Sequence, residues 1–292
     1  MARGDLTDEQ WERLEPLLPP VPKMGRPPRD RRQVLDGIWG RARTGSPWRD
    51  VPGRYGPWET AYSVFRRWQI DGTWARVLQE LQVKADADGV IEWEVSVDST
   101  VCRAHQHAAG ARKRGLPIRA GRVLAYLAAE PDDHALGRSR GGLTTKLHLA
   151  ADASGHVLAV TVTGGQRGDA PQFTRLVDKI RVARTDGGRP RTRPSRVIAD
   201  RAYSSRAIRV YLRRRQIPHT IPEKRDQAGH RLRRGSAGGR APGFDREVYK
   251  RRHKVECRIG LLKQARGVAT RYDKLAVRYE ATVQLTLIRQ SL

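Results

Sequence analysis

A chain of 292 residues can form one large domain, or a small domain beside a larger one. It carries 57 Lys and Arg against 31 Asp and Glu, a net charge of +26, and 38% of its residues are hydrophobic. These values exclude a disordered tail and favour a polyanionic partner, of which nucleic acid is the obvious candidate. Because the chain has no long apolar stretch, no signal-peptide core and only two cysteines, we expect a cytoplasmic, nucleoid-associated protein without membrane contact.

The pattern of the first 85 residues predicts a small helical domain that holds six of the seven tryptophans. Thr7 and Gln10 have the spacing of a capping box at the start of the first helix. The basic, proline-containing segment 25–29 is expected to be an extended linker. Helices are expected over residues 5–18, 30–44, 57–70 and 72–82. We expect residues 1–84 to bind DNA, with a helix-turn-helix among these helices, although the pattern does not single out the helix that enters the groove.

The composition changes at residues 85–89, after which the apolar runs become shorter and alternate. Strands are expected over residues 94–98, 143–151, 157–163, 196–200 and 217–222. Helices are expected over residues 169–183, 204–215 and most of 245–287. Residues 225–243 contain five Gly and many Arg, which predicts a mobile basic loop. This order indicates an α/β fold over residues 90–292, in which helices cover a sheet.

Two aspartates stand at the expected ends of strands, Asp98 in the segment SVDST and Asp200 in VIADRAY. Open α/β sheets place reacting groups at such positions, and Asp is a poor strand residue that is rarely buried without a partner. A third acid, Glu256, lies in a predicted helix that should turn Val255 and Leu262 towards the core. Three oxygen ligands from separate elements suit Mg²⁺, with Mn²⁺ as a substitute, and two ions about 4 Å apart would serve phosphoryl transfer. Each acid taken alone is also compatible with a helix cap or a surface ion pair.

Tyr249, Arg252, Glu256 and Lys263 are spaced by three, four and seven residues. On one continuous α-helix these steps return to the same face, so the four side chains would point to one site. An Arg and a Lys beside a metal-binding Glu would suit a phosphodiester substrate, because both can bind phosphate oxygens. A solvated basic helix with a Tyr at its edge remains the alternative from spacing alone.

The same four residues match the Y-(2)-R-(3)-E-(6)-K signature of the IS5-type transposases in the IS4/IS5 DDE group, which the chain resembles. The segments SVDSTVCRAHQHAAGARK, ADRAYSS and TRYDKLA and the opening LTDEQWERLEPLLP are also similar to blocks of that family. The resemblance covers nearly the whole chain, and its motifs occur in the right order. It implies an RNase H-like DDE catalytic core with Asp98, Asp200 and Glu256 as the catalytic, metal-binding triad.

The resemblance further implies that Tyr249, Arg252 and Lys263 contact DNA, and that the protein binds the terminal inverted repeats of an insertion sequence. Cutting at those ends and joining to target DNA implies double-stranded DNA as the partner and at least a homodimer on it. Residues 181–266, with 26 basic and seven acidic residues, are expected to follow the DNA. Two alternatives remain open: a catalytically silent DNA-binding repressor derived from a transposase, and a metal-dependent nuclease that cuts without joining.

Other candidate residues carry weaker signals. His105 and His107 have H-x-H spacing, but no third zinc ligand is near in sequence, so phosphate or structural contacts are expected. Cys102 and Cys257 are expected to be ordinary buried thiols, since no histidine is placed to activate them. Asp169 is expected to cap the helix that follows it.

Overall fold

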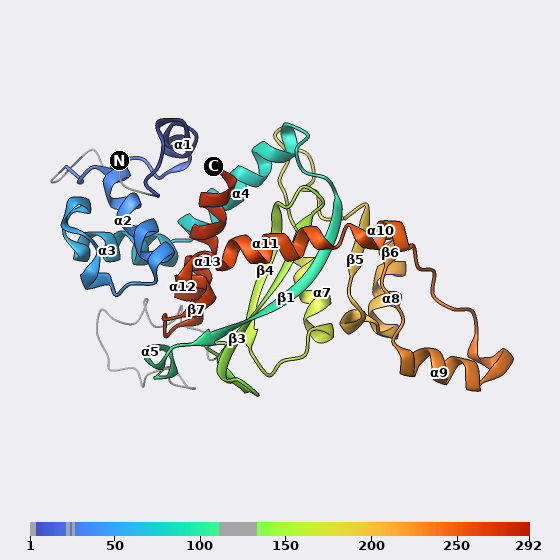
Figure 1. Ribbon diagram of the computed structural model, residues 1–292. Coiled ribbons are helices and arrows are strands. Elements are labelled where there is room, and N and C mark those ends of the chain that lie inside the picture. Colours follow the sequence, from blue (N-terminus) through green and yellow to red (C-terminus); the bar gives the residue numbers. More distant parts are fainter. Residues whose placement is uncertain (1–3, 22–23, 25–26, 111–132) are drawn as a thin grey trace, which may run out of the picture.

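The computed structural model describes residues 4–21, 24, 27–110 and 133–292. The predicted linker over 25–29 and the block after His107 therefore lie partly outside the described residues. The N-terminal region is helical, as predicted (Figure 1). Its helices are α1 (Asp8–Leu14), α2 (Arg31–Thr44), α3 (Trp58–Ile70) and α4 (Thr73–Ala87). The predicted capping box is confirmed, because the Gln10 amide donates to Thr7 Oγ1 at 3.2 Å and the Gln10 side chain accepts from the Thr7 amide.

The core of this helical region is completed from the other end of the chain. Helix α13 (Ala276–Ser291) packs against α2, α3 and α4, and its Ala281, Leu285 and Ile288 are buried among their apolar residues. The Trp39 indole donates to the Leu285 carbonyl oxygen at 2.9 Å. The first and last segments of the described chain are therefore joined in one apolar cluster, and Figure 1 shows the C-terminus beside the N-terminal helices.

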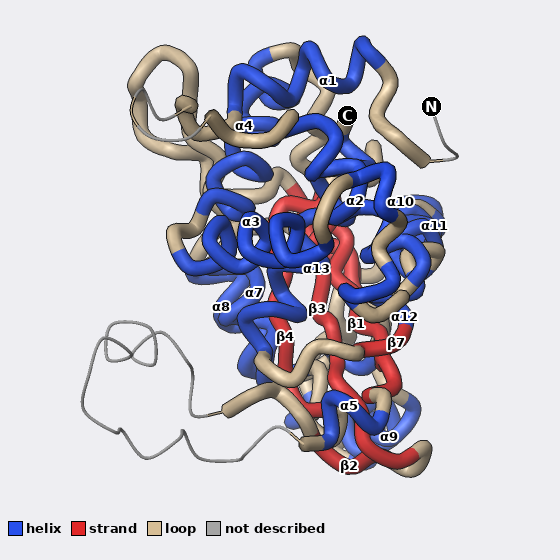
Figure 2. Tube along the Cα trace, turned by 90° about the vertical axis from the view of Figure 1, so that its left-hand side faces the viewer, coloured by secondary structure: helices blue, strands red, loops and turns tan. Residues whose placement is uncertain are grey.

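A mixed sheet forms the centre of the rest of the molecule (Figure 2). Its main strands are β1 (Glu94–Ala104), β3 (Gly142–Asp152), β4 (Val157–Gly164), β5 (Arg196–Ala199) and β6 (His219–Thr220). Strand β3 pairs antiparallel with β4 and β1, whereas β5 pairs parallel with β1 and β6 pairs parallel with β5. The short strand β2 (Gly137–Ser139) pairs antiparallel with β3. The short strand β7 (Thr270–Arg271) pairs parallel with the end of β1. This arrangement confirms the α/β prediction and is that of an RNase H-like core.

Helices cover both faces of the sheet, as Figure 1 shows. Helices α7 (Phe173–Asp178) and α8 (Arg206–Arg214) bury one face, where Val95 and Val97 of β1 point. Helices α11 (His253–Lys263) and α13 bury the other, where Cys102 and Leu149 point. The other α-helices in the described residues are α5 (Gln106–Ala109), α9 (Arg225–Arg233), α10 (Arg246–Lys250) and α12 (Arg266–Ala269). No helix in the described part of the chain is long and apolar enough to cross a membrane.

Three expectations from the sequence need correction. The strand expected to end at Asp98 continues to Ala104, because β3 pairs with it as far as Arg103 and β-branched residues follow the acid. The basic loop expected over 225–243 contains helix α9, whose start is fixed by Gln227 through hydrogen bonds to Ser204 and the Lys224 amide. The helix expected over 169–183 is short, since α7 spans Phe173–Asp178 and Val182 pairs with Arg191.

The hairpin over 143–163 and the strand over 196–200 are confirmed, and 204–215 is helical over Arg206–Arg214. The tail is mostly helical, as expected, but it contains β7 and a break between α10 and α11. At the break, the amides of Arg251 and Arg252 donate to carbonyls three residues back instead of four. This tighter turn separates Tyr249 from the helix that carries Glu256 and Lys263, so the four signature residues do not share one continuous helix.

Candidate active site

Asp98 on β1 lies beside Asp200, which directly follows the neighbouring parallel strand β5. Val97 of β1 is in register with Ala199 of β5, so the residues that follow them, Asp98 and Asp200, occupy the next positions. Alternation along β1 turns Asp98 away from the face that buries Val95 and Val97, and towards α11. The mixed topology thus joins two acids that are 102 positions apart in sequence.

The electrostatics of this pair favour a cation. Burial raises the pKa of Asp98, and the negative charge of Asp200 raises it further. The Ser99 amide, which donates to Asp98 Oδ1 at 2.8 Å, and the Arg252 guanidinium act in the opposite direction. Asp200 caps the following 3₁₀ turn, since its Oδ1 accepts from the Ala202 amide at 2.8 Å. Two neighbouring carboxylates that are partly removed from water gain from a shared positive charge.

In this structure Arg252 supplies a positive charge to Asp98 and to Glu256. One guanidinium nitrogen lies 2.9 Å from Asp98 Oδ2, and the other contacts Glu256 Oε1. Burial lowers the pKa of Arg252, but the two carboxylates outweigh this effect, and its pKa is raised overall. Glu256 remains 52% exposed, although its helix buries Val255 and Leu262 against the sheet as expected.

The donor atoms present suit a hard divalent ion. Asp98, Asp200 and Glu256 offer carboxylate oxygens alone, which Mg²⁺ and Mn²⁺ prefer over nitrogen or sulfur. Within the described ranges, however, no three His, Cys, Asp or Glu side chains converge at metal-binding distance. In this structure the Arg252 guanidinium pairs with both Asp98 and Glu256 and lies between these two carboxylates.

Of the two remaining signature residues, Tyr249 lies on α10 and Lys263 is the last residue of α11. Tyr249 is half-buried on α10, with its ring 5.2 Å from the Phe244 ring and 6.0 Å from the Arg252 guanidinium carbon. Lys263 Nζ donates to the Val101 carbonyl oxygen of β1 at 3.0 Å. Arg252 and Lys263 therefore both reach β1, three residues apart, although the helix through Tyr249 is interrupted.

The opposite face of the sheet contains a polar network that the sequence analysis missed. Ser99 Oγ donates to Asp169 Oδ1 at 2.8 Å, and Lys146 Nζ lies 3.0 Å from the same oxygen. The Tyr203 hydroxyl is buried nearby, and burial together with the charges of Asp169, Asp98 and Asp200 raises its pKa. Burial lowers the pKa of His148 to about 4, so this imidazole is neutral near pH 7.

Asp169 is not the side-chain helix cap that we expected, because its carboxylate is taken by Ser99 and Lys146. The position of Ser99 directly after Asp98 is the one sequence signal for this network, since neighbouring residues of a strand face opposite sides. The expectation of two buried thiols is half right: Cys102 is buried in the sheet, but Cys257 is exposed. The side chain of His105 accepts from the His107 amide at 3.3 Å, a structural contact.

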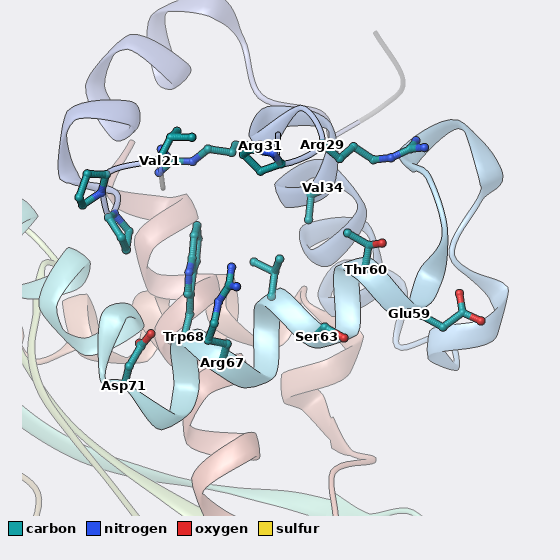
Figure 3. A pocket seen from close by; sticks show the side chains of 14 residues that line it. Val21, Arg29, Arg31, Val34, Glu59, Thr60, Ser63, Arg67, Trp68 and Asp71 are labelled. Atoms are coloured by element: carbon teal, nitrogen blue, oxygen red, sulfur yellow. The ribbon is translucent and has the colours of Figure 1, made fainter. Parts of the chain in front are cut away.

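A separate cavity of about 600 Å³ lies in the helical region, between the proline-containing segment after α1 and helices α2 and α3 (Figure 3). Trp68 and Arg67 of α3 form its floor, and Val21 and Arg29 lie across from them. None of its lining residues belongs to the carboxylate site.

Comparisons with known proteins agree with this architecture. Residues 6–78 match the family described as "Putative transposase of IS4/5 family", and residues 91–289 match "Transposase DDE domain". An uncharacterized protein, y4sN, of Sinorhizobium fredii is 41% identical over 109 residues, which cover 37% of this chain and 83% of that protein. A putative transposase for the element IS6501 of Brucella ovis is 28% identical over 143 residues, covering 49% of this chain and 94% of that one.

Among solved structures, the Mos1 transposase paired-end complex with left transposon end has a TM-score of 0.23 and 11% identity, covering 84% of this chain and 82% of that one. A similarity at that level carries no structural argument. Nothing in these matches favours a catalytically silent repressor. Because the DDE match spans more than half of the chain, the protein belongs to the DDE transposases and is a DNA transposase of the IS4/5 type.

Proposed function

We propose that this transposase cuts the ends of its insertion sequence and joins the freed 3′ ends to target DNA, with Asp98, Asp200 and Glu256 as the catalytic carboxylates. The observation that carries the proposal is the register of β1 and β5, which sets Asp98 beside Asp200 under Arg252 and Glu256. Asp98 and Asp200 would hold Mg²⁺ or Mn²⁺, and Glu256 would join them once Arg252 leaves. The ion supplies Lewis-acid stabilisation of the charge that develops on the phosphoryl oxygens.

The chemistry would consist of two in-line displacements without a covalent protein intermediate. In the first, the oxygen of a water bonds to phosphorus at the element end and releases a proton to solvent, while the P–O3′ bond breaks and the leaving 3′ oxygen takes up a proton. In the second, that 3′ hydroxyl bonds to a target phosphorus and loses its proton to solvent, and the target's own 3′ oxygen leaves and takes up a proton. Arg252, released from the carboxylates, would donate two hydrogen bonds to phosphate oxygens, and Lys263 and Tyr249 would contact the flanking strand.

The two parts of the chain would have different roles. The helical domain over residues 1–84 would recognise the terminal inverted repeats, and residues 90–292 would form the catalytic domain with its basic segment near 225–243. The positive charge of the segment around α8 and α9 supports a role for this segment in DNA binding. A cavity of about 780 Å³ there is lined by Arg206, Arg209, Arg213 and Arg231. Cutting two ends in concert would require at least a homodimer on DNA.

The test is single-turnover cleavage of an end duplex by Asp98→Asn, Asp200→Asn and Glu256→Gln in Mg²⁺ or Mn²⁺ buffer. Loss of a residue that only supports a metal ligand costs about 10- to 100-fold, so loss of a ligand should slow cleavage by at least about 100-fold. Binding of the uncut duplex should stay unchanged or become tighter, because one negative charge that repels phosphate is removed. Asp88→Asn, an exposed acid after α4, is the matched control. Wild-type cleavage by all three variants, or cleavage in excess EDTA, would rule the proposal out.

A further inference from the structure

A third cavity, of about 500 Å³, lies between the helical region and the far end of β1. On one side it is lined by Trp48, Trp58 and Tyr62, from the α2–α3 connection and α3. On the other side it is lined by His105, directly after β1, and Tyr272, directly after β7. Figure 1 shows β7 and α12 between the helical region and the α5 end of β1. The carboxylate site uses none of these residues.

Aromatic rings form pairs on each side of this cavity. The Trp48 and Tyr62 rings meet edge to face with centroids 5.4 Å apart. The His105 and Tyr272 rings lie 5.0 Å apart. All four side chains are only half-buried, so part of each ring faces the cavity. Paired rings of this kind hold one another in place and still offer surface for a planar ligand.

The charges around the cavity favour an anion. Lys274, Arg278 and Arg41 line it, and among its described lining residues Asp273 is the one acid. The Asp273 carboxylate already lies 3.1 Å from Arg41 and accepts a hydrogen bond from Thr282. The remaining field at the cavity is therefore positive, and the exposed ammonium group of Lys274 adds to it.

The wall of the cavity is rigid. Gly45 has a φ of +69°, and a Cβ there would lie 2.8 Å from the Tyr272 ring, so glycine is needed for the helical region to approach β7. Arg271 is fully buried and donates to the carbonyl oxygens of Asp273 and Lys274 at 2.8 and 2.7 Å. Because these contacts already hold the wall in place, a ligand that binds here does not have to meet the entropy cost of ordering it.

We propose that this cavity binds one unpaired nucleotide of the DNA strand that passes the carboxylates, with its base against the aromatic rings and its phosphate near Lys274 and Arg278. In a duplex each base is covered by its neighbours, so only an extruded or single-stranded base can stack on protein rings. The volume suits a small ligand and is too small for a duplex. This inference rests on the proposed DNA cleavage at Asp98.

For a DNA strand that runs along β1 from Asp98 to the cavity, the length of β1 sets the position of that nucleotide. Seven residues of extended backbone separate Asp98 from His105, which corresponds to about 23 Å at a rise of about 3.3 Å per residue. Successive nucleotides of one B-DNA strand are about 3.4 Å apart along the axis. The bound nucleotide should therefore lie about seven positions from the cleaved phosphate.

The first test uses the full chain in EDTA, so that it does not depend on catalysis. Binding of fluorescein-labelled oligothymidylate of ten nucleotides is compared with binding of a 20-base-pair duplex by anisotropy. Trp58→Ala should weaken oligothymidylate binding about tenfold, as expected for the loss of one stacked base, and change duplex binding less than about twofold. Trp58→Phe should restore most of the affinity, because a ring is kept. Trp11→Ala removes a half-buried tryptophan of α1 outside the cavity and should change neither affinity.

Unchanged oligothymidylate binding by folded Trp58→Ala, or an equal loss for both DNAs, would overturn the proposal even if Asp98→Asn abolishes cleavage. Conversely, a selective loss in Trp58→Ala alongside wild-type cleavage by all three carboxylate variants would leave the cavity as a single-strand site and overturn the catalytic proposal. The second test is photocrosslinking with 5-iodouracil at successive positions of an end duplex. Crosslinks to Trp58 or Tyr272 are expected at about the sixth to eighth nucleotide from the cleaved phosphate, and crosslinks confined to other positions would overturn the alignment along β1.

Discussion

Two arginines of this transposase pair with carboxylates in different regions, and their surroundings differ sharply. Arg41 of α2 meets Asp273 where the helical region joins the C-terminal segment, and the two side chains are 6% and 7% exposed. Arg252 meets Asp98 and Glu256 at the sheet, with side chains 17%, 19% and 52% exposed. Water can therefore reach the partners of Arg252, whereas the pair formed by Arg41 and Asp273 is almost closed to it. The Arg41 ion pair is therefore a fixed contact between two regions, whereas the Arg252 ion pairs can exchange their partners.

The largest effect that would test this difference is the loss of Asp273. Asp273→Asn leaves Arg41 charged and buried without its counter-ion, which should lower the free energy of unfolding by about 3–5 kcal/mol. Asp98→Asn removes a partner of the more exposed Arg252 and should change it by less than about 1 kcal/mol. Urea denaturation of both variants measures the two values. Equal losses would mean that the two arginine sites do not differ in the way described.

A buried polar group on the other face of the sheet provides the next test. Burial lowers the folded-state pKa of His148 to about 4, below the ordinary histidine value of about 6.5, so the unfolded chain binds more protons between these two pH values. The stability due to a neutral His148 is thus complete above about pH 6.5 and is lost as the pH falls towards 4, by up to about 3 kcal/mol. His148→Gln should reduce the difference between unfolding free energies at pH 7 and pH 4.5. His107→Gln, at an exposed position, should keep the wild-type difference, and the same difference in all three proteins would contradict the prediction.

Removing the guanidinium from the carboxylate site should have a smaller effect in free energy than the two changes above. It should strengthen an interaction, the binding of a metal ion, instead of weakening the fold. In Arg252→Gln no cation bridges Asp98 and Glu256, so Mn²⁺ should bind about five- to tenfold more tightly without DNA, equivalent to about 1–1.4 kcal/mol. Calorimetric titration with Mn²⁺ measures this directly. The control is Arg251→Gln, whose guanidinium pairs with Glu94 at 3.0 Å. If both variants bind Mn²⁺ like the wild type, Arg252 does not compete with the metal ion.

The sequence could predict local elements of this fold, but not the contacts between segments that are distant along the chain. Alternation and turn residues located the β3–β4 hairpin and β5, and the signature spacing drew attention to Arg252 and Glu256. The contact of Arg252 with Asp98 joins residues 154 positions apart and depends on where α11 crosses β1, which no local pattern encodes. The Asp169 network was missed for the same reason, because its members come from three segments. The α10–α11 break depends on four tightened hydrogen bonds, donated by the amides of Arg251, Arg252, Lys254 and Val255, for which the residue types give no clear signal.

The smallest expected effect concerns Lys263, whose ammonium group donates to the Val101 carbonyl oxygen, a contact that DNA can replace. Lys263→Ala should change the unfolding free energy by less than about 0.5 kcal/mol, as for most surface substitutions. If Lys263 turns to a phosphate when DNA binds, the slope of log K against log salt should become shallower by about 1. Lys263→Arg should restore that slope, because the charge is kept, but not the cleavage rate, because a planar guanidinium is larger and aimed differently. Lys84→Ala, at an exposed position on α4, provides the matched control. An unaltered slope in Lys263→Ala would make Lys263 a structural contact of β1, so that among the signature cations only Arg252 would exchange a protein partner for DNA.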